Sequence, residues 1–249
     1  MSSTKIVIPA RYGSSRLVGK PLLEICNKPI FWHVYQRCLE AGFSREDILL
    51  ATDNNKIFNK ATELSIPVTI TSTDHESGTD RIFEVVNDNG WSAEDIVINV
   101  QGDEPLISPN LIKLVSKFAR DREEFSISTA ITSIKRYEDF INPNIVKAVI
   151  GENNSALYFT RSASPFNRDK PEDISMAHRH IGIYAYRVSA LAKFCSYDKS
   201  PLEDYEKLEQ LRALSHGMRI GVCYYDGEIY HGVDTMEDYL SIKNMMENI

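Results

Sequence analysis

Short apolar runs and amphipathic stretches alternate along the first half of the chain. Runs rich in β-branched and other apolar residues, typical of buried strands, occupy 6–8, 47–52, 68–71 and 96–100. Between them, apolar residues recur at three- and four-residue spacing, which predicts helices at 29–39, 55–64 and 78–89. Strands that alternate with helices in this way predict right-handed crossovers and a parallel sheet.

The second half of the chain has a different pattern. Ser108 and Pro109 are an N-cap and a first-turn proline, and they predict a helix that continues through 111–118. Four strands with little helix between them are then expected at 126–133, 145–150, 157–159 and 181–186. They indicate an antiparallel extension of the sheet or a β-rich lobe. A capping-box pattern at 200–203 predicts a helix to about residue 214. The last predicted elements are a strand at 220–225 and a helix at 236–246.

The fold class expected from this pattern is α/β, with a mainly parallel central sheet, helices on both faces and a smaller β-rich lobe. No internal repeat, low-complexity tract or linker divides the sequence, so a single domain over 1–249 is expected. Its parts are expected at about 1–125, about 126–215 for the lobe, and about 216–249 for a closing strand and helix. Ligands of parallel sheets gather at the carboxyl ends of the strands. The loops after residues 8, 52, 71 and 100 should therefore converge on one crevice.

A basic loop follows the first strand. Gly13 and Gly19 allow its backbone to approach a ligand closely, and three cations, Arg11, Arg16 and Lys20, lie within ten residues. A polyphosphate suits this loop, because guanidinium groups, an ammonium and free amides all bind phosphate oxygens. A solvated basic loop explains the spacing equally well, since the G-x-x-x-x-G-K-[ST] pattern of a P-loop is absent.

Two acidic residues follow strands at positions suited to a metal. Asp103 comes after the buried strand at 96–100, and Asp234 lies in a turn near the end of the chain. Magnesium prefers oxygen ligands and is commonly held by one or two carboxylates plus substrate phosphates. Taken alone, each aspartate is better explained as a turn residue that stabilises its own loop. Two of them beside a basic loop favour a metal-bridged nucleotide site.

Two other polar groups are candidates for ligand contacts. The segment 74–81 offers free amides at Gly78 and Thr79 and side chains sized for the edge of a base, although a simple N-cap also explains it. Later in the chain, cationic and aromatic residues that would suit an anionic sugar gather at Arg161, Arg168, Arg179, His180, Tyr158 and Tyr184. On the residues alone, a surface charge cluster explains this second group slightly better.

The composition argues against a nucleic-acid-binding, membrane or secreted protein. The 249 residues carry a formal net charge of −7, which argues against nonspecific nucleic-acid binding. No apolar run approaches the roughly 20 residues of a membrane helix, and the N-terminus lacks a signal-peptide core. A cytoplasmic protein with no nucleic-acid or membrane partner is expected. The four cysteines lack close pairing and are expected to be reduced core thiols.

An ordered set of motifs from the first strand to the last helix is highly specific when taken together. The motifs are IPARY at 8–12, Arg16 with GKPL at 19–22, ATD at 51–53, DH at 74–75, SGT at 77–79, NVQGDEP at 99–105, NPN at 142–144, HIGIY at 180–184, SPLE at 200–203, LEQLR at 208–212 and GVDT at 232–235. This set closely resembles the 3-deoxy-D-manno-octulosonate cytidylyltransferase family.

The resemblance implies a nucleotidyltransferase fold of the glycosyltransferase-A-like type, a homodimer, and the coupling of CTP to an eight-carbon ulosonate with Mg²⁺ as cofactor. It implies that the first part of the chain binds the nucleotide and that the lobe binds sugar and forms the dimer. The implied catalytic residues are Arg11, Lys20, Asp103 and Asp234, of which the two aspartates bind the metal. The implied nucleotide-binding residues are Ala10, Arg11, Gly13, Ser14, Arg16, Lys20, Ser77, Gly78, Thr79, Arg81 and Gln101. The implied sugar-binding residues are Arg161, Arg168, His180, Tyr184, Glu209 and Gln210.

The chain departs from the family pattern at three places. Val18 replaces a common proline, Phe166 and Asn167 replace a tryptophan and an aspartate, and the segment 229–232 replaces a glycine-threonine-glycine. Two of these changes fall where the sugar is expected, so the 8-amino analogue of the octulosonate is an alternative substrate. The sequence is also compatible with activation of a nine-carbon sialic acid or a sugar phosphate, and with a nucleotide-binding regulator that has no turnover.

Overall fold

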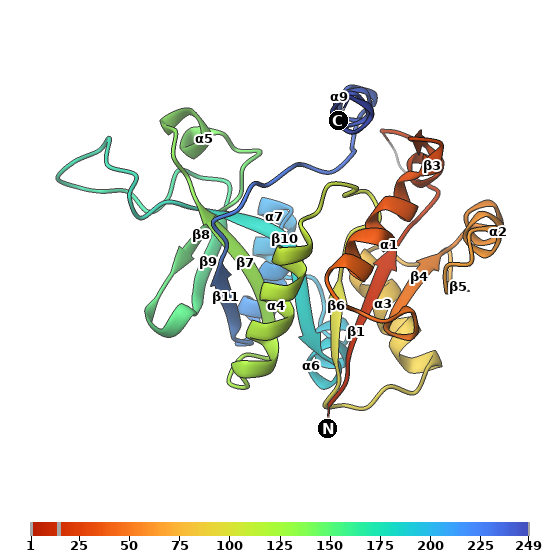
Figure 1. Cartoon of the computed structure of the whole chain (residues 1–249). Helices are drawn as coiled ribbons and strands as arrows, with labels where there is room; N and C mark the ends of the chain where they lie inside the picture. The colour runs from red at the N-terminus through yellow and green to blue at the C-terminus, as the bar shows by residue number, and fades with distance from the viewer. Residues whose placement is uncertain (1, 14–15, 249) are drawn as a thin grey trace. The chain divides into compact units, whose positions relative to one another are not determined.

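The computed structural model describes residues 2–13 and 16–248, which divide into two compact units (Figure 1). The first unit comprises Met1–Lys113 and Glu228–Ile249, and the second comprises Leu114–Gly227, so the division falls within helix α4 (Pro109–Asp121). In the described part of the chain, no helix combines the length and the apolar character that crossing a membrane requires.

The first unit is built on a parallel sheet with strand order β6-β1-β4-β5. Its strands are β1 (Thr4–Pro9), β4 (Ile48–Thr52), β5 (Val68–Ile70) and β6 (Ile96–Asn99). Its helices are α1 (Ile30–Glu40), α2 (Asn55–Glu63), α3 (Gly78–Asp88) and α9 (Met236–Glu247). Short elements are η1 (Lys20–Leu22), η2 (Arg45–Asp47) and the hairpin of β2 (Glu24–Ile25) with β3 (Lys28–Pro29).

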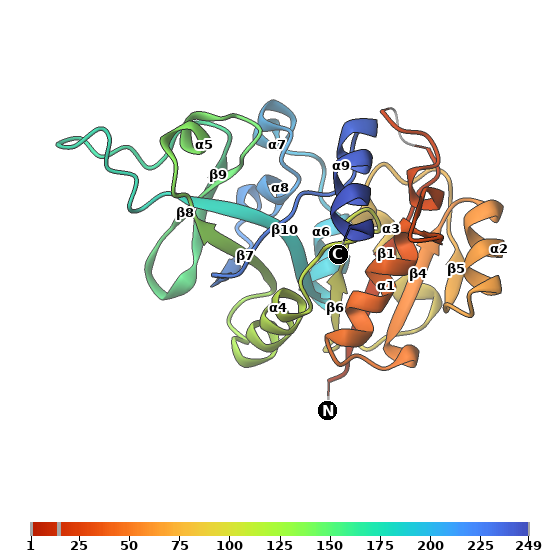
Figure 2. The ribbon, with the colours of Figure 1, turned by 45° about the horizontal axis from the view of Figure 1, so that its top comes forward.

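Strand β1 lies in the interior of this sheet. Ile6, Val7 and Ile8 are fully buried, because β1 is flanked by β4 on one side and β6 on the other, with α1 and α3 on opposite faces (Figure 2). A strand buried on both faces reads as a continuous apolar run, and this is the pattern that predicted it. The predicted α/β class with a mainly parallel sheet is confirmed, with small differences at the ends of the elements.

Helix α9 returns the end of the chain to the first unit. It begins at the capping box of Thr235 and Asp238, and its Ile242 packs in a cluster with Ile25 and Ile30. The β2-β3 hairpin supplies part of this cluster, although the apolar pattern did not predict it. As a result, the turn that carries Asp234 is fixed next to the start of a well-capped helix.

The second unit consists mainly of antiparallel strands. Its strands are β7 (Ile127–Ser133), β8 (Lys147–Ile150), β9 (Ala156–Thr160), β10 (His178–Arg187) and β11 (Ile220–Tyr224). Strand β10 pairs antiparallel with β7 and β8, β8 pairs antiparallel with β9, and β11 pairs parallel with β7. Its other elements are α5 (Tyr137–Ile141), η3 (Glu152–Asn154), α6 (Val188–Cys195), α7 (Pro201–Glu206) and α8 (Gln210–Ser215).

The single helix predicted from residue 200 to about 214 is wrong, because the chain forms two helices there. Lys207 takes a left-handed conformation with φ of 53° and ends α7. The bend brings Arg212 of α8 back to Glu203 of α7, where Nε and a terminal nitrogen donate to the two carboxylate oxygens at 2.8 and 2.6 Å. Sequence spacing on one straight helix does not anticipate this buried pair. Helices α5 and α6 were also missed.

The pair between Glu203 and Arg212 gives a test of the second unit. Glu203→Gln should lower the free energy of unfolding by about 3–5 kcal/mol, because it leaves a buried guanidinium without its counter-charge. Asp121→Asn breaks the exposed pair with Lys117 and should cost less than about 1 kcal/mol. Urea unfolding of both variants measures the difference, and equal costs would show that the buried pair does not stabilise the bend.

Candidate active site

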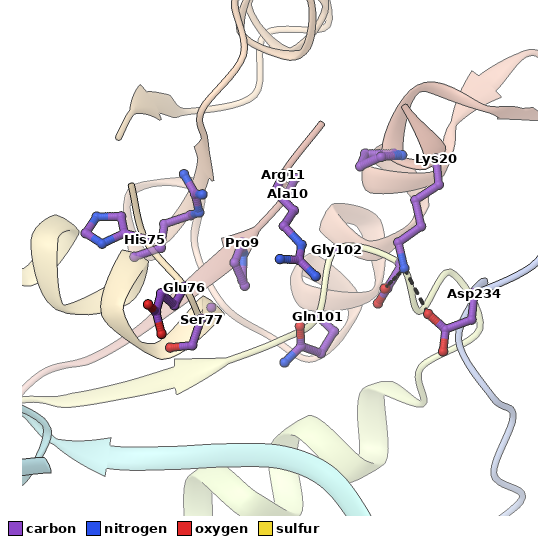
Figure 3. A pocket seen from close by; sticks show the side chains of 14 residues that line it. Pro9, Ala10, Arg11, Lys20, His75, Glu76, Ser77, Gln101, Gly102 and Asp234 are labelled. Atoms are coloured by element: carbon purple, nitrogen blue, oxygen red, sulfur yellow. Dashed lines mark hydrogen bonds and ion pairs between the residues drawn. The ribbon is translucent and has the colours of Figure 1, made fainter. Parts of the chain in front are cut away.

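A pocket of about 210 Å³ lies in the first unit at the carboxyl ends of β1 and β6, as expected for ligands of a parallel sheet (Figure 3). The loop after β1, the start of α3, the loop after β6 and the turn before α9 all contribute to it. The lining residues are Pro9, Ala10, Arg11, Lys20, Pro21, His75, Glu76, Ser77, Gly78, Arg81, Gln101, Gly102, Asp103 and Asp234.

Lys20 joins the two acidic residues in this pocket. Its Nζ lies 2.5 Å from Asp103 Oδ2 and 3.1 Å from Asp234 Oδ1, and Figure 3 shows the contact with Asp234 as a dashed line. The Lys20 side chain is only 11% exposed. Gly19 takes a left-handed conformation with φ of 71° just before η1, and this turn delivers Lys20 to the carboxylates. Two carboxylates therefore share one cation at the sheet edge.

The positions of the two aspartates are fixed by backbone contacts. The Gly102 amide donates to Pro9 O at 3.2 Å, and a Cβ at Gly102 would lie only 2.7 Å from that oxygen, so glycine lets the two loops meet. Val233 donates its amide to Asp103 O at 2.8 Å, which places Asp234 beside Asp103. In the described part of the chain, no group of three or more His, Cys, Asp or Glu side chains is arranged to hold a metal.

The wall formed by α3 is held by two ion pairs. Arg81 is buried and its terminal nitrogen lies 3.0 Å from Asp53 Oδ2, while His75 contacts Glu84. Burial acts to raise the pKa of Glu84, but hydrogen bonds from His75 and from the Ser72 amide outweigh it and hold that pKa below its ordinary value. Burial lowers the pKa of Arg81, and the Asp53 carboxylate works against that shift.

The structure brings most of the predicted nucleotide-binding residues to this pocket, but not all of them. Arg16 is exposed outside the lining and contacts Asp234 Oδ2 at 3.2 Å. Gly13 and Thr79 do not line the pocket, and Thr79 is buried. Ser14 lies outside the described residues. Sequence reasoning placed His75 and Glu76 only within the candidate segment 74–81. It assigned no role to Asp53, although Asp53 follows a strand just as Asp103 does.

Three of the predicted sugar-binding residues, His180, Tyr184 and Glu209, lie in one cluster of the second unit, and a fourth, Gln210, is next to Glu209 in the chain. The rings of His180 and Tyr184 are 5.4 Å apart, and the charge of Glu209 contributes to the raised pKa of Tyr184 after burial and Tyr186. Gln210 follows Glu209 at the start of α8. Within the described residues, the buried Tyr184 hydroxyl and Gln210 Nε2 have no hydrogen-bond partner.

The two predicted arginines do not join this cluster by any contact that the structure describes. Arg161 donates from Nε to Glu206 O at 2.7 Å and from a terminal nitrogen to Pro143 O at 2.9 Å, so its guanidinium holds two backbone segments together. Arg168 is exposed. A sequence motif shows that an arginine is present, but it does not show whether backbone carbonyls occupy its donors.

Comparison with known proteins identifies the family. The cytidylyltransferase family profile matches residues 5–220. A 3-deoxy-manno-octulosonate cytidylyltransferase of Acinetobacter baumannii strain AYE is 42% identical over 96% of this chain and 96% of its own. One from Francisella tularensis subsp. novicida is 43% identical over 98% and 99%. The chain belongs to the 3-deoxy-manno-octulosonate cytidylyltransferase family.

Solved structures agree with this family. A CMP:2-keto-3-deoxy-manno-octonic acid synthetase complexed with CTP superposes with a TM-score of 0.91 at 38% identity, over 99% of both chains. A putative glucose-1-phosphate thymidylyltransferase from Bacillus anthracis, at 13% identity and a TM-score of 0.66, shares the fold alone. The resemblance inferred from the motifs is confirmed, and this cytidylyltransferase family member is a nucleotidyltransferase.

The imidazole of His180 should make the stability of the protein depend on pH. Burial lowers the pKa of His180 to about 3, with the Arg179 cation adding to the shift. Between that value and about 6.5 the unfolded chain binds a proton that the folded chain does not, so stability falls as the pH falls, by at most about 1.4 kcal/mol per pH unit. His180→Gln lacks this dependence. The free energy of unfolding of the wild type relative to this variant should decrease from pH 6.5 to pH 4.5 and stay constant above pH 7.5. Identical pH profiles would contradict a buried neutral His180.

Proposed function

We propose that this family member couples CTP to 3-deoxy-manno-octulosonate and releases pyrophosphate, giving the CMP-sugar used in lipopolysaccharide biosynthesis. The names of relatives that match nearly the whole chain support this activity. The observation that carries the proposal is the pocket where Arg11, Lys20, Asp103 and Asp234 meet, since a triphosphate needs cations and a nucleotide-bound metal needs carboxylates.

The reaction requires positioning and charge more than covalent chemistry from the protein. The anomeric hydroxyl oxygen of the sugar attacks the α-phosphorus of CTP and its proton passes to water. The bond between the α-phosphorus and the oxygen that bridges to the β-phosphate breaks, and pyrophosphate leaves with the electron pair. Arg11, Arg16 and Lys20 offset the negative charge of the triphosphate, and Ser77 and Gly78 at the amino end of α3 offer donors to the nucleoside. No nucleophilic serine or cysteine is needed.

The residues of the pocket fit a magnesium ion. Asp103 and Asp234 already direct one oxygen each at a single cation, the Lys20 ammonium, and two carboxylates with substrate phosphates are a common magnesium environment. We therefore propose Asp103 and Asp234 as the chain's ligands to the metal. When bound, Mg²⁺ neutralises phosphate charge and acidifies a coordinated hydroxyl.

The cluster in the second unit suits the ulosonate. Tyr184 and Gln210 each present a buried donor, and a sugar carboxylate with several hydroxyls supplies acceptors for both. We propose His180, Tyr184, Glu209 and Gln210 as its contacts, with Arg161 as a brace for the neighbouring backbone and Arg168 as a predicted contact on an exposed loop.

The homodimer and the cytoplasmic location stay predictions. Apolar side chains of the second unit that suit a subunit contact are well exposed at Leu157, Phe166, Met176 and Tyr205. A second copy of the chain is the partner that the family resemblance implies.

Pyrophosphate release tests the proposed activity. With CTP and Mg²⁺, release should occur with 3-deoxy-manno-octulosonate and should be absent with a nine-carbon sialic acid or a hexose phosphate. A parallel arm with the 8-amino analogue tests that sugar as the substrate, and a higher kcat/KM for it would replace the proposed one. Asp103→Asn should abolish release, which controls for a contaminating enzyme. CTP binding without turnover on any of these sugars would contradict an enzyme.

A further inference from the structure

Asp53 connects two parts of the nucleotide pocket although it is not among the residues that line it. It follows β4, and its Oδ1 accepts a hydrogen bond from the Tyr12 amide at 3.0 Å. Its Oδ2 accepts from a terminal nitrogen of Arg81 at 3.0 Å. One carboxylate thus holds the backbone next to Arg11 and a side chain of α3.

Arg81 also binds the segment between β5 and α3. Its other terminal nitrogen donates to the Thr71 hydroxyl and to Ser72 O, the latter at 3.3 Å. The Thr71 hydroxyl in turn donates to Thr52 O at 3.1 Å, beside Asp53 in the chain. The loop that leads to Ser77 is therefore tied to the end of β4 at two points.

Glu84 completes the fixation of the same loop. Its carboxylate accepts from the Ser72 amide at 2.9 Å and contacts His75, which lines the pocket. Two residues of the loop, Ser72 and His75, thus contact the same side chain of α3. Asp53 is the group that links this fastened loop to the segment after β1, because it alone among these residues contacts Tyr12 in the described contacts.

Charge explains why a carboxylate is needed at this position. The Arg81 side chain is only 3% exposed, and Arg11 is close enough to disfavour the Arg81 charge. Two guanidinium groups at one pocket repel each other, and a buried one is costly without a counter-charge. The Asp53 carboxylate lets both cations stay at the pocket.

We propose that Asp53 is a positioning residue for the nucleotide. It fixes the distance between the segment that carries Arg11 and the segment that carries Ser77 and Gly78, and so sets the affinity for a nucleoside triphosphate. This role rests on the proposed function, because it presumes that CTP occupies this pocket. Small displacements of binding groups are known to have large effects on productive binding.

Asp53→Asn tests this role, because it keeps the size of the side chain and removes its charge and one acceptor. Calorimetry without sugar should show CTP bound about tenfold or more weakly than by the wild type, and KM for CTP should rise equally while KM for the sugar stays unchanged. Asp53→Asn/Arg81→Met should lose less than the product of the two single losses, because the two residues act through each other. If Asp53→Asn does not fold, the double variant, which removes both charges, is compared with the wild type, and unchanged CTP affinity would overturn the role.

Asp95→Asn is the matched control. Like Asp53, Asp95 uses both carboxylate oxygens to join two segments of the first unit: it accepts from the amides of Ser3 at 2.6 Å and Ser92 at 2.9 Å. It lies, however, near the amino ends of β1 and β6. Asp95→Asn should lower the melting temperature and leave CTP affinity unchanged. The positioning role, but not the proposed function, would be overturned by either of two results. One is equal CTP affinity in Asp53→Asn and the wild type, and the other is an equal rise in KM for the sugar and for CTP. Failure of the wild type to bind CTP would overturn the proposed function together with this role.

Discussion

The ammonium of Lys20 is the contact on which the pocket depends. It binds one carboxylate 83 residues away and another 214 residues away, so it joins the loop after β1, the loop after β6 and the turn before α9. Two carboxylates that both contact one ammonium are close enough to repel each other, and the cation between them offsets this repulsion. The protein alone meets this requirement with its own side chain. Under the proposed function, a triphosphate would attract Lys20, and Asp103 and Asp234 would then be the side chains that hold the metal.

The rest of the pocket follows the same logic of paired charges on rigid elements. Arg81 is neutralised by Asp53 and His75 contacts Glu84, so the wall of the pocket is held, while Arg11 in the lining and Arg16 outside it are both exposed. Burying charges is costly, and pairs with good geometry limit that cost. A site prepared in this way needs little rearrangement to receive a strongly anionic ligand.

Sequence reasoning predicted most of the first unit, because β1 and its neighbouring parallel strands are buried on both faces and the helices between them are amphipathic. It placed Asp103 and Lys20 together, since both follow strands of one sheet. It missed the break at Lys207, which depends on a contact between Glu203 and Arg212 of two helices. Likewise, the motif containing Arg161 did not show that its guanidinium is occupied by backbone carbonyls. Hydrophobic periodicity records which face is buried, whereas these contacts are decided by tertiary structure.

The most direct test of a metal site between Asp103 and Asp234 is Mn²⁺ binding without nucleotide, measured by the loss of the free-ion electron paramagnetic resonance signal. If the ammonium occupies the position of the metal, Lys20→Met should bind Mn²⁺ about tenfold or more tightly than the wild type, because one competing charge has been removed. Adding Asp234→Asn to Lys20→Met should cancel the gain. Equal Mn²⁺ affinity in the wild type and Lys20→Met, or a gain that survives the loss of Asp234, would contradict a metal site between these two carboxylates.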